Sequence, residues 1–170
     1  MWLKPVDSET SSKVTNSVIY EATTNAVGWT ANRTSFAGDN AKTAILPIIG
    51  STISSTGKRY RYTVSFPIYI SKHTYGQNNT PVGGKVSCSL IGNNKTISFD
   101  VSQKIVASAS YSYRDIDITL SFESPNWIGN VSTITLVPDA TKLSSSYSAG
   151  NILNSSTANK TIRVICEIIE

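Results

Sequence analysis

Residues 56–71 read TGKRYRYTVSFPIYIS, and this stretch decides the fold. Alternate positions from Tyr60 to Ile70 are apolar or aromatic, whereas the intervening positions carry basic or hydroxyl side chains up to Pro67. Side chains of a strand point alternately to two faces, so a period of two predicts a strand with one buried and one solvent-exposed face. Pro67 cannot donate to a ladder, so we expect the strand to lie at a sheet edge or to end its pairing there.

The composition of the whole chain favours an all-β fold. Serine and threonine together number 45 among 170 residues, and strong helix formers are scarce. Threonine, valine, isoleucine and tyrosine suit pleated surfaces, while serine, asparagine and glycine fill turns. The length fits a single domain, residues 1–170, with a core of its own.

About nine short strands with one wet face predict an antiparallel β-sandwich or jelly roll. The local hairpins are residues 85–91 with 96–102, across Gly92-Asn93-Asn94-Lys95, and residues 105–113 with 116–123, across Arg114-Asp115. The other expected strands are residues 14–21, 27–36, 43–49 (apolar on both faces and broken by Pro47), 131–137 and 161–169.

Three segments lie outside this pattern. Residues 1–13 are polar, and such a terminus frays unless something pins it, so we expect it to pack on a neighbouring subunit. Residues 71–84 form a Gly/Asn/Pro-rich loop, and residues 139–160 form a long Ser/Thr/Asn-rich loop or contain one short strand.

Charge and hydropathy exclude several classes of protein. The net charge of +4 is mild, whereas a dedicated nucleic-acid binder usually concentrates more Lys and Arg on one face. No stretch is apolar enough for a membrane span, and the polar start does not read as a secretory signal peptide. Cys88 and Cys166 each occupy the apolar register of a strand, which favours two buried free thiols over a disulfide.

The sequence offers few groups for catalysis or metal binding. His73 is the single histidine, and it lies in the 71–84 loop without a nucleophile motif, so we interpret it as solvated rather than catalytic. One histidine and two distant cysteines match no metal-ligand spacing. We therefore expect no enzyme activity and no cofactor.

Aromatic and basic side chains provide the remaining candidates. Tyr60, Tyr62, Tyr111 and Tyr113 share the apolar register of their strands, which favours core or interface packing over a platform for sugars or bases. Lys58, Arg59 and Arg61 form the locally dense basic cluster. It is either a solvated face that deters edge-to-edge aggregation or a contact with nucleic-acid phosphates or a second subunit.

The same stretch resembles a known family. GKRYRYTVSFP, residues 57–67, is similar to the corresponding strand of RNA-phage coat proteins, and the likeness extends over residues 28–66. In that family this sheet faces the genome inside the shell. Those coats end in two helices, whereas this chain ends in Ser/Thr-rich strands, so the resemblance implies a small viral coat protein in general.

These observations predict a structural subunit of a virus or phage particle (a coat, spike or decoration protein) that self-associates through strand edges and loops. It would be made in the host cytoplasm and act in the virion. One alternative is a fibre head or adhesin that recognises a host glycan through its loops, with His73, Tyr75 and Asn78 as candidate contacts. Another is a secreted pilus subunit, an extracellular appendage whose cysteines should be paired. A small hydrolase using His73 is the remaining alternative.

Overall fold

The computed structural model describes residues 13–29, 43–53, 59–74, 82–107, 113–141, 143–144, 148–153 and 159–169. These residues form eleven strands and no helix, which confirms the all-β prediction. The strands are β1 (Val14–Thr23), β2 (Ala44–Ile49), β3 (Arg59–Thr74), β4 (Val82–Gly92), β5 (Lys95–Ser98), β6 (Gln103–Ala107), β7 (Tyr113–Ser124), β8 (Thr133–Ala140), β9 (Leu143–Ser144), β10 (Ser148–Leu153) and β11 (Thr161–Ile169).

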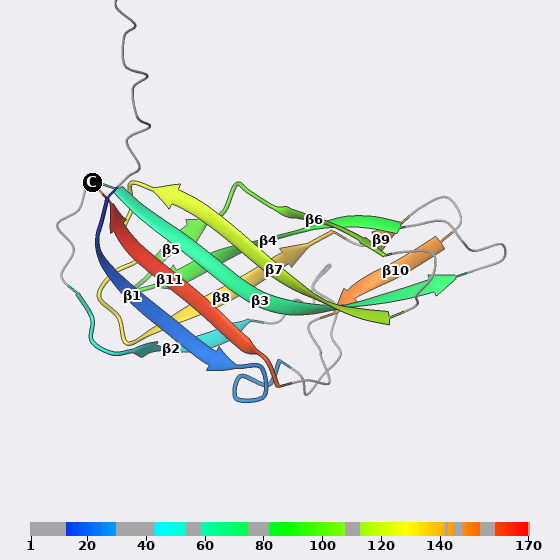
Figure 1. Ribbon diagram of the computed structural model, residues 1–170, viewed down its shortest axis with the longest axis horizontal. Coiled ribbons are helices and arrows are strands. Elements are labelled where there is room, and N and C mark those ends of the chain that lie inside the picture. The colour runs from blue at the N-terminus through cyan, green and yellow to red at the C-terminus, as the bar shows by residue number, and fades with distance from the viewer. Residues whose placement is uncertain are drawn as a thin grey trace, which may run out of the picture.

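The strands form one antiparallel sheet folded into two layers. Its order is β10-β9-β4-β8-β2-β1-β11-β3-β7, and β10 also pairs with β3, so the sheet nearly closes into a barrel. Figure 1 shows β1, β11, β3 and β7 as a front layer, with β4, β5, β6 and β8 behind them. β2 connects the layers, since it pairs with β8 at one end and with β1 at the other. The arrangement is that of a sandwich or jelly roll.

β3 is a central strand, and the prediction that it lies at a sheet edge was wrong. It pairs with β7 along most of its length, with β11 up to Ser65 and with β10 from Tyr69 onward. Pro67 is buried where β3 changes neighbours from β11 to β10. On that side no ladder requires its missing N–H, and its carbonyl accepts a hydrogen bond from Trp29 Nε1 at 2.9 Å. The expected end of pairing at Pro67 therefore holds for one of the two neighbours.

The first predicted hairpin is present. β4 and β5 pair from Ser89–Ser98 to Gly92–Lys95, and Asn93 and Asn94 have φ angles of 48° and 60°. A two-residue loop with both φ values positive suits the right-handed twist of a hairpin, and asparagine tolerates it. Gly92 has a different role, because a Cβ there would lie 2.8 Å from Ile128 Cγ1.

The second predicted hairpin was wrong. β6 pairs with β4, and β7 pairs with β3, so the two arms belong to different layers. Arg114 and Asp115 are strand residues of β7, opposite Ile70 and Tyr69. The alternation along β7 is nevertheless as predicted, with Ile118 and Leu120 buried. Periodicity identified the faces of the strand, but it could not identify its distant partner.

Three other expectations need correction. Residues 24–29 form a turn, so no strand begins at Val27; the rest of the predicted 27–36 strand lies outside the described residues. β2 continues through Pro47, and Ile45 and Ile49 are exposed, so only one of its faces is buried. Residues 139–160 include the end of β8 and two further strands, β9 and β10, rather than at most one.

The layers enclose a core whose large polar aromatics keep hydrogen-bond partners. Tyr62 is fully buried, and its hydroxyl donates to Asn126 O at 2.7 Å and accepts from the Ile128 N–H at 2.9 Å. Tyr60 is also buried and packs against Trp127. These contacts confirm the predicted core packing of both tyrosines. Tyr113 lies in β7, and Tyr111 lies outside the described residues.

The final strand matches its prediction most closely. β11 buries Ile162, Val164, Cys166 and Ile168, and it lies between β1 and β3 in the front layer. Residues 1–12 of the expected N-terminal arm lie outside the described residues, so its packing stays a prediction. Within the described segments there is no helix that could cross a bilayer.

Candidate functional site

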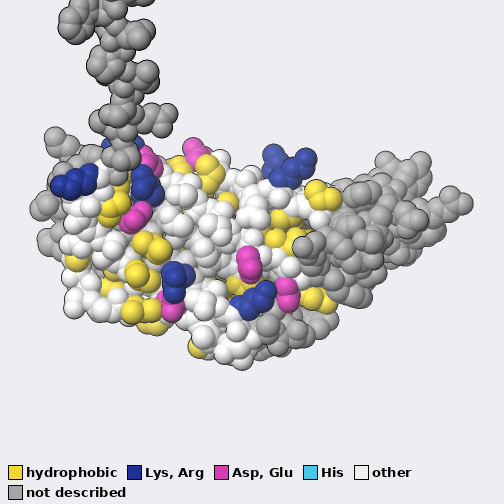
Figure 2. All heavy atoms as spheres, viewed as in Figure 1, with side chains coloured by type: hydrophobic (Ala, Val, Ile, Leu, Met, Phe, Trp, Pro, Cys, Tyr) yellow, Lys and Arg dark blue, Asp and Glu magenta, His cyan; other side chains and the backbone are white. Residues whose placement is uncertain are grey.

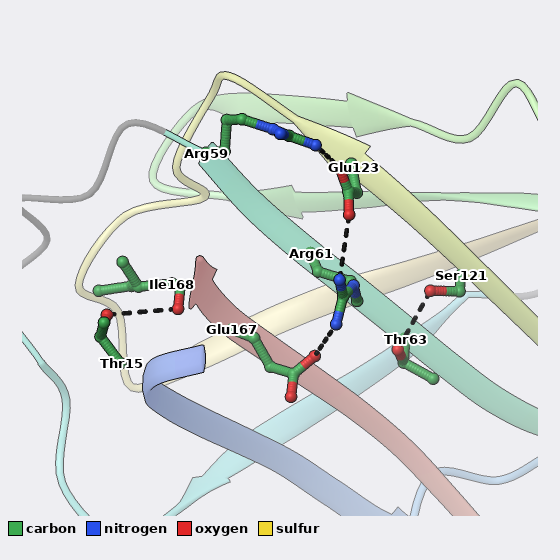
Figure 3. A network of polar contacts seen from close by, with 8 residues as sticks. All are labelled: Thr15, Arg59, Arg61, Thr63, Ser121, Glu123, Glu167 and Ile168. Carbon is green, nitrogen blue, oxygen red and sulfur yellow. Dashed lines mark hydrogen bonds and ion pairs between the residues drawn. The ribbon is translucent and has the colours of Figure 1, made fainter. Parts of the chain in front are cut away.

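Arg59 and Arg61 of the basic cluster lie within a ladder of opposite charges on the outer face of the front layer. Pairing of β3 with β7 sets Arg61 opposite Glu123, and pairing with β11 sets it opposite Glu167. Arg61 Nη2 lies 3.2 Å from Glu123 Oε1, and its Nη1 lies 3.8 Å from Glu167 Oε2. Arg59 pairs with the other oxygen of Glu123, as Figure 3 shows. Two arginines and two glutamates on three neighbouring strands thus balance one another.

The electrostatics of this ladder are those of a solvated network. Partial desolvation alone would raise the pKa of the Glu123 carboxyl, but hydrogen bonds from Arg59 and Arg61 outweigh it and hold that pKa below its usual range. The side chain of Arg59 is 56% exposed and that of Glu123 is 36% exposed. Exposed pairs of this kind contribute about 0–1 kcal/mol each because water and salt screen them. The ladder neutralises the charges of these side chains but adds little to the stability of the fold.

The sequence placed both arginines correctly on the solvent face but missed their glutamate partners. Lys58 lies outside the described residues. Glu123 and Glu167 both occupy the polar register of their strands, so the signal was present. Strand pairing was needed to use it, because the partners lie more than sixty residues apart along the chain. A face whose cations are paired offers less net positive charge to phosphates than the isolated cluster suggested.

The candidate ligand loop begins later than predicted. His73 lies in β3, where its backbone pairs with Ala149 of β10, so its assignment to a loop was wrong. Tyr75 and Asn78 lie outside the described residues. The pairing of β3 with β10, and of Gly83 in β4 with Ser144 in β9, brings together the borders of the two segments that were predicted as loops. Both meet at one end of the molecule, on the right of Figure 1.

The two cysteines are free and buried, one in each layer. Burial raises the pKa of the Cys88 thiol to about 12, and burial together with the nearby Glu167 charge raises that of Cys166 to about 12. A thiol of this kind stays protonated at neutral pH, which makes it a poor nucleophile. The described residues contain no group of three His, Cys, Asp or Glu side chains that could hold a metal ion.

A shallow pocket of about 120 Å³ lies beside the β4–β8 ladder, and two of the hydroxyl side chains that line it bond to the backbone. The Ser87 hydroxyl donates to the carbonyls of Phe99 and Val101. Thr141 Oγ1 accepts from the Lys85 N–H at 2.8 Å. These two hydroxyls are therefore already engaged by the backbone, which leaves them less free to orient a ligand.

Exposed isoleucines lie on the outer side of the sheet, across β4, β8 and β2. Register places Ile91, Thr135 and Ile45 in one row across these strands, and Ile49 follows on the same side of β2. Ile45 is 61% exposed, Ile49 51% and Ile91 39%. We call Ile45, Ile49 and Ile91 the isoleucine row. Figure 2, which views the front layer, shows that apolar and charged side chains are interspersed there.

Comparisons with known proteins identify no family. No family model matches the chain, and no curated protein matches it significantly. Among solved structures, one described as "CBM4 structure and function" is similar over 89% of this chain and 84% of its own, at 11% sequence identity and a TM-score of 0.21. A TM-score this low carries no argument about fold or function.

Proposed function

We propose that this chain is a non-enzymatic structural subunit of a virus or phage particle, a coat, spike or decoration protein that acts by self-association. The observation that supports it best is the isoleucine row, with Ile45 61% exposed. Covering exposed apolar surface yields roughly 25 cal/mol per Å², so burial of these three side chains on one face of the sheet would favour association. The resemblance of residues 57–67 to phage coat strands supports the particle role.

The test is the assembly state of the purified full chain. Sedimentation velocity over a range of concentrations gives the oligomer mass, and negative-stain electron microscopy gives its shape. Closed shells, trimers or regular arrays would support the proposal. A chain that sediments as a monomer at every concentration, before and after addition of viral nucleic acid, would contradict it.

A second candidate is a fibre head or adhesin that recognises a host glycan. It is favoured by the meeting of the two predicted loop regions at one end of the molecule, through β3 with β10 and β4 with β9. A glycan array probed with the full chain tests it, with His73→Ala, Tyr75→Ala and Asn78→Ala as variants. Binding that at least one of these variants weakens would support it, and binding that all three leave unchanged would not.

The pilus alternative called for paired cysteines, and Cys88 and Cys166 are both free in the structure. No feature of the described residues favours it over the two candidates above.

A further inference from the structure

β7 forms the border of the front layer, and no described strand covers the outward edge of its C-terminal half. It pairs with β3, and no other strand among the described residues pairs with it. Thr119 N–H and Asp117 C=O bond to a side chain of β6 instead of to β3. Backbone groups of successive strand residues point to alternate sides, so Ser121 and Glu123 also direct theirs away from β3.

A glutamine side chain closes the middle of this edge. Gln103 Oε1 accepts from Thr119 N–H at 2.9 Å, and Gln103 Nε2 donates to Asp117 C=O at 3.2 Å. The amide thus replaces a neighbouring strand at those two groups. Within the described part of the chain, the C=O of Thr119, both backbone groups of Ser121 and the N–H of Glu123 have no hydrogen-bond partner. An edge of this kind is a template for another strand.

We propose that β7 pairs with β7 of a second copy of this chain, antiparallel about a twofold axis at Ser121. This rests on the proposed function as a self-associating subunit. Ser121 would exchange its N–H and C=O with its own counterpart, and Glu123 N–H would reach the Thr119 C=O of the other copy. These bonds use the four groups that lack partners among the described residues, and they require none of the groups that Gln103 occupies. An isologous contact of this kind closes a dimer.

Side chains on both faces suit this register. Outside, Glu123 would face Thr119 of the other copy, and its charge is already matched by Arg59 and Arg61. Inside, Leu120 would face the ring of Phe122, which is half-buried and stacks on Phe99 with centroids 5.4 Å apart. A twofold axis at Thr119 would instead set Asp115 opposite Glu123, and like charges opposite one another destabilise a ladder.

Cysteine cross-linking tests the register. Ser121→Cys would place two thiols opposite each other across the axis, within the Cα separation of up to about 6.8 Å that a disulfide allows. Thr119→Cys is the matched control, because it lies on the same face of the same edge but away from the axis. Under mild oxidation we expect Ser121→Cys to give mostly covalent dimer on a non-reducing gel, and at least tenfold less from Thr119→Cys. Equal cross-linking of the two variants, or none in either, would overturn the proposal.

Removing an edge donor tests the energetics. Ser121→Pro deletes an N–H that points away from β3, and proline is tolerated at such an edge position. We expect an unchanged circular dichroism spectrum and a dimer dissociation constant at least tenfold higher by sedimentation equilibrium. If wild type and Ser121→Pro associate equally, the β7 contact fails while self-association stands. If the wild type is monomeric throughout, the proposed function fails as well.

Discussion

The two outer faces of the molecule meet water in different ways. On the front layer, Arg59 and Arg61 lie in register with Glu123 and Glu167, and each charge has an opposite neighbour. Across β4, β8 and β2 the outer side presents the isoleucine row and threonine, with the charged side chains of Lys85 and Asp139 further along β4 and β8. Both faces belong to one sheet and cover one core, so the fold does not account for the difference.

The two surfaces differ in how much free energy each would gain if a binding partner covered it. Ions that are paired within the chain lose little when water surrounds them. Exposed isoleucines keep a hydration cost that only burial removes. The basic cluster, which stands out in the sequence, therefore gains little from a binding partner. The isoleucine row gains more, because a partner would remove it from water.

The largest expected effect is the loss of stability on substitution in the core that both faces cover, and the smaller effects are compared with it. Phe66 is 2% exposed and packs edge-to-face against Trp29, with centroids 5.9 Å apart. Phe66→Ala should lower the free energy of unfolding by about 3–5 kcal/mol through the cavity it leaves. Denaturant titration measures this, with Ser65→Ala on the outer face as the control at about 0.5 kcal/mol or less. Similar losses in both variants would mean that the assigned faces are wrong.

The next largest effect is the loss of stability at alkaline pH, which tests whether water is excluded from both layers around the buried thiols. The pKa of each buried thiol is raised from 9.0 to about 12, so between these values the unfolded chain has ionised thiolates while the folded chain does not. Stability is therefore full below pH 9 and falls above it, by up to about 1.4 kcal/mol per pH unit for each thiol. Unfolding titrations at pH 8, 9 and 10 should show a shallower loss in Cys88→Ala and in Cys166→Ala than in the wild type. If one of the two variants loses stability with pH as steeply as the wild type, water reaches the thiol in the layer that it probes.

A smaller effect tests the isoleucine row directly. Ile45→Ser with Ile49→Ser should change stability by less than about 1 kcal/mol, because both side chains are exposed, yet weaken self-association at least tenfold, about 1.4 kcal/mol. Sedimentation equilibrium measures this. Val14→Ser, at 42% exposure on β1, is the control with an apolar side chain outside the row. Equal weakening by the control would make the effect one of general surface hydropathy.

The smallest effect is expected at the basic cluster. Arg59→Gln with Arg61→Gln should shift stability by about 0.5 kcal/mol or less at neutral pH, and leave the nucleic-acid content of assembled particles unchanged. The pKa of Glu123 is lowered by these arginines, so their contribution is present above the ordinary carboxyl pKa and disappears as the pH falls below it. The double variant should therefore lose less stability than the wild type on acidification. Reduced nucleic-acid content with intact assembly would restore the phosphate-contact hypothesis.

The sequence predicted what depends on local alternation. The faces of β3, β4 and β11 follow from a period of two, and the Asn93–Asn94 turn follows from residues that tolerate positive φ. What failed depends on distant pairing. The arms of the second expected hairpin are near neighbours in sequence, yet they join different layers. The partners of Arg61 became visible only once β7 and β11 were known to flank β3.

The place of β11 between β1 and β3 has a consequence for how the protein is made. Its residues follow every other described strand along the chain, yet the front layer is split without them. During synthesis β1 and β3 emerge early, with apolar faces and unpaired edges, and they wait for a partner that follows every other described strand. Loop-closure entropy makes such long-range pairing slow, and unpaired strands of this kind are prone to aggregate while they wait. The front layer therefore cannot be completed until β11 has been synthesised.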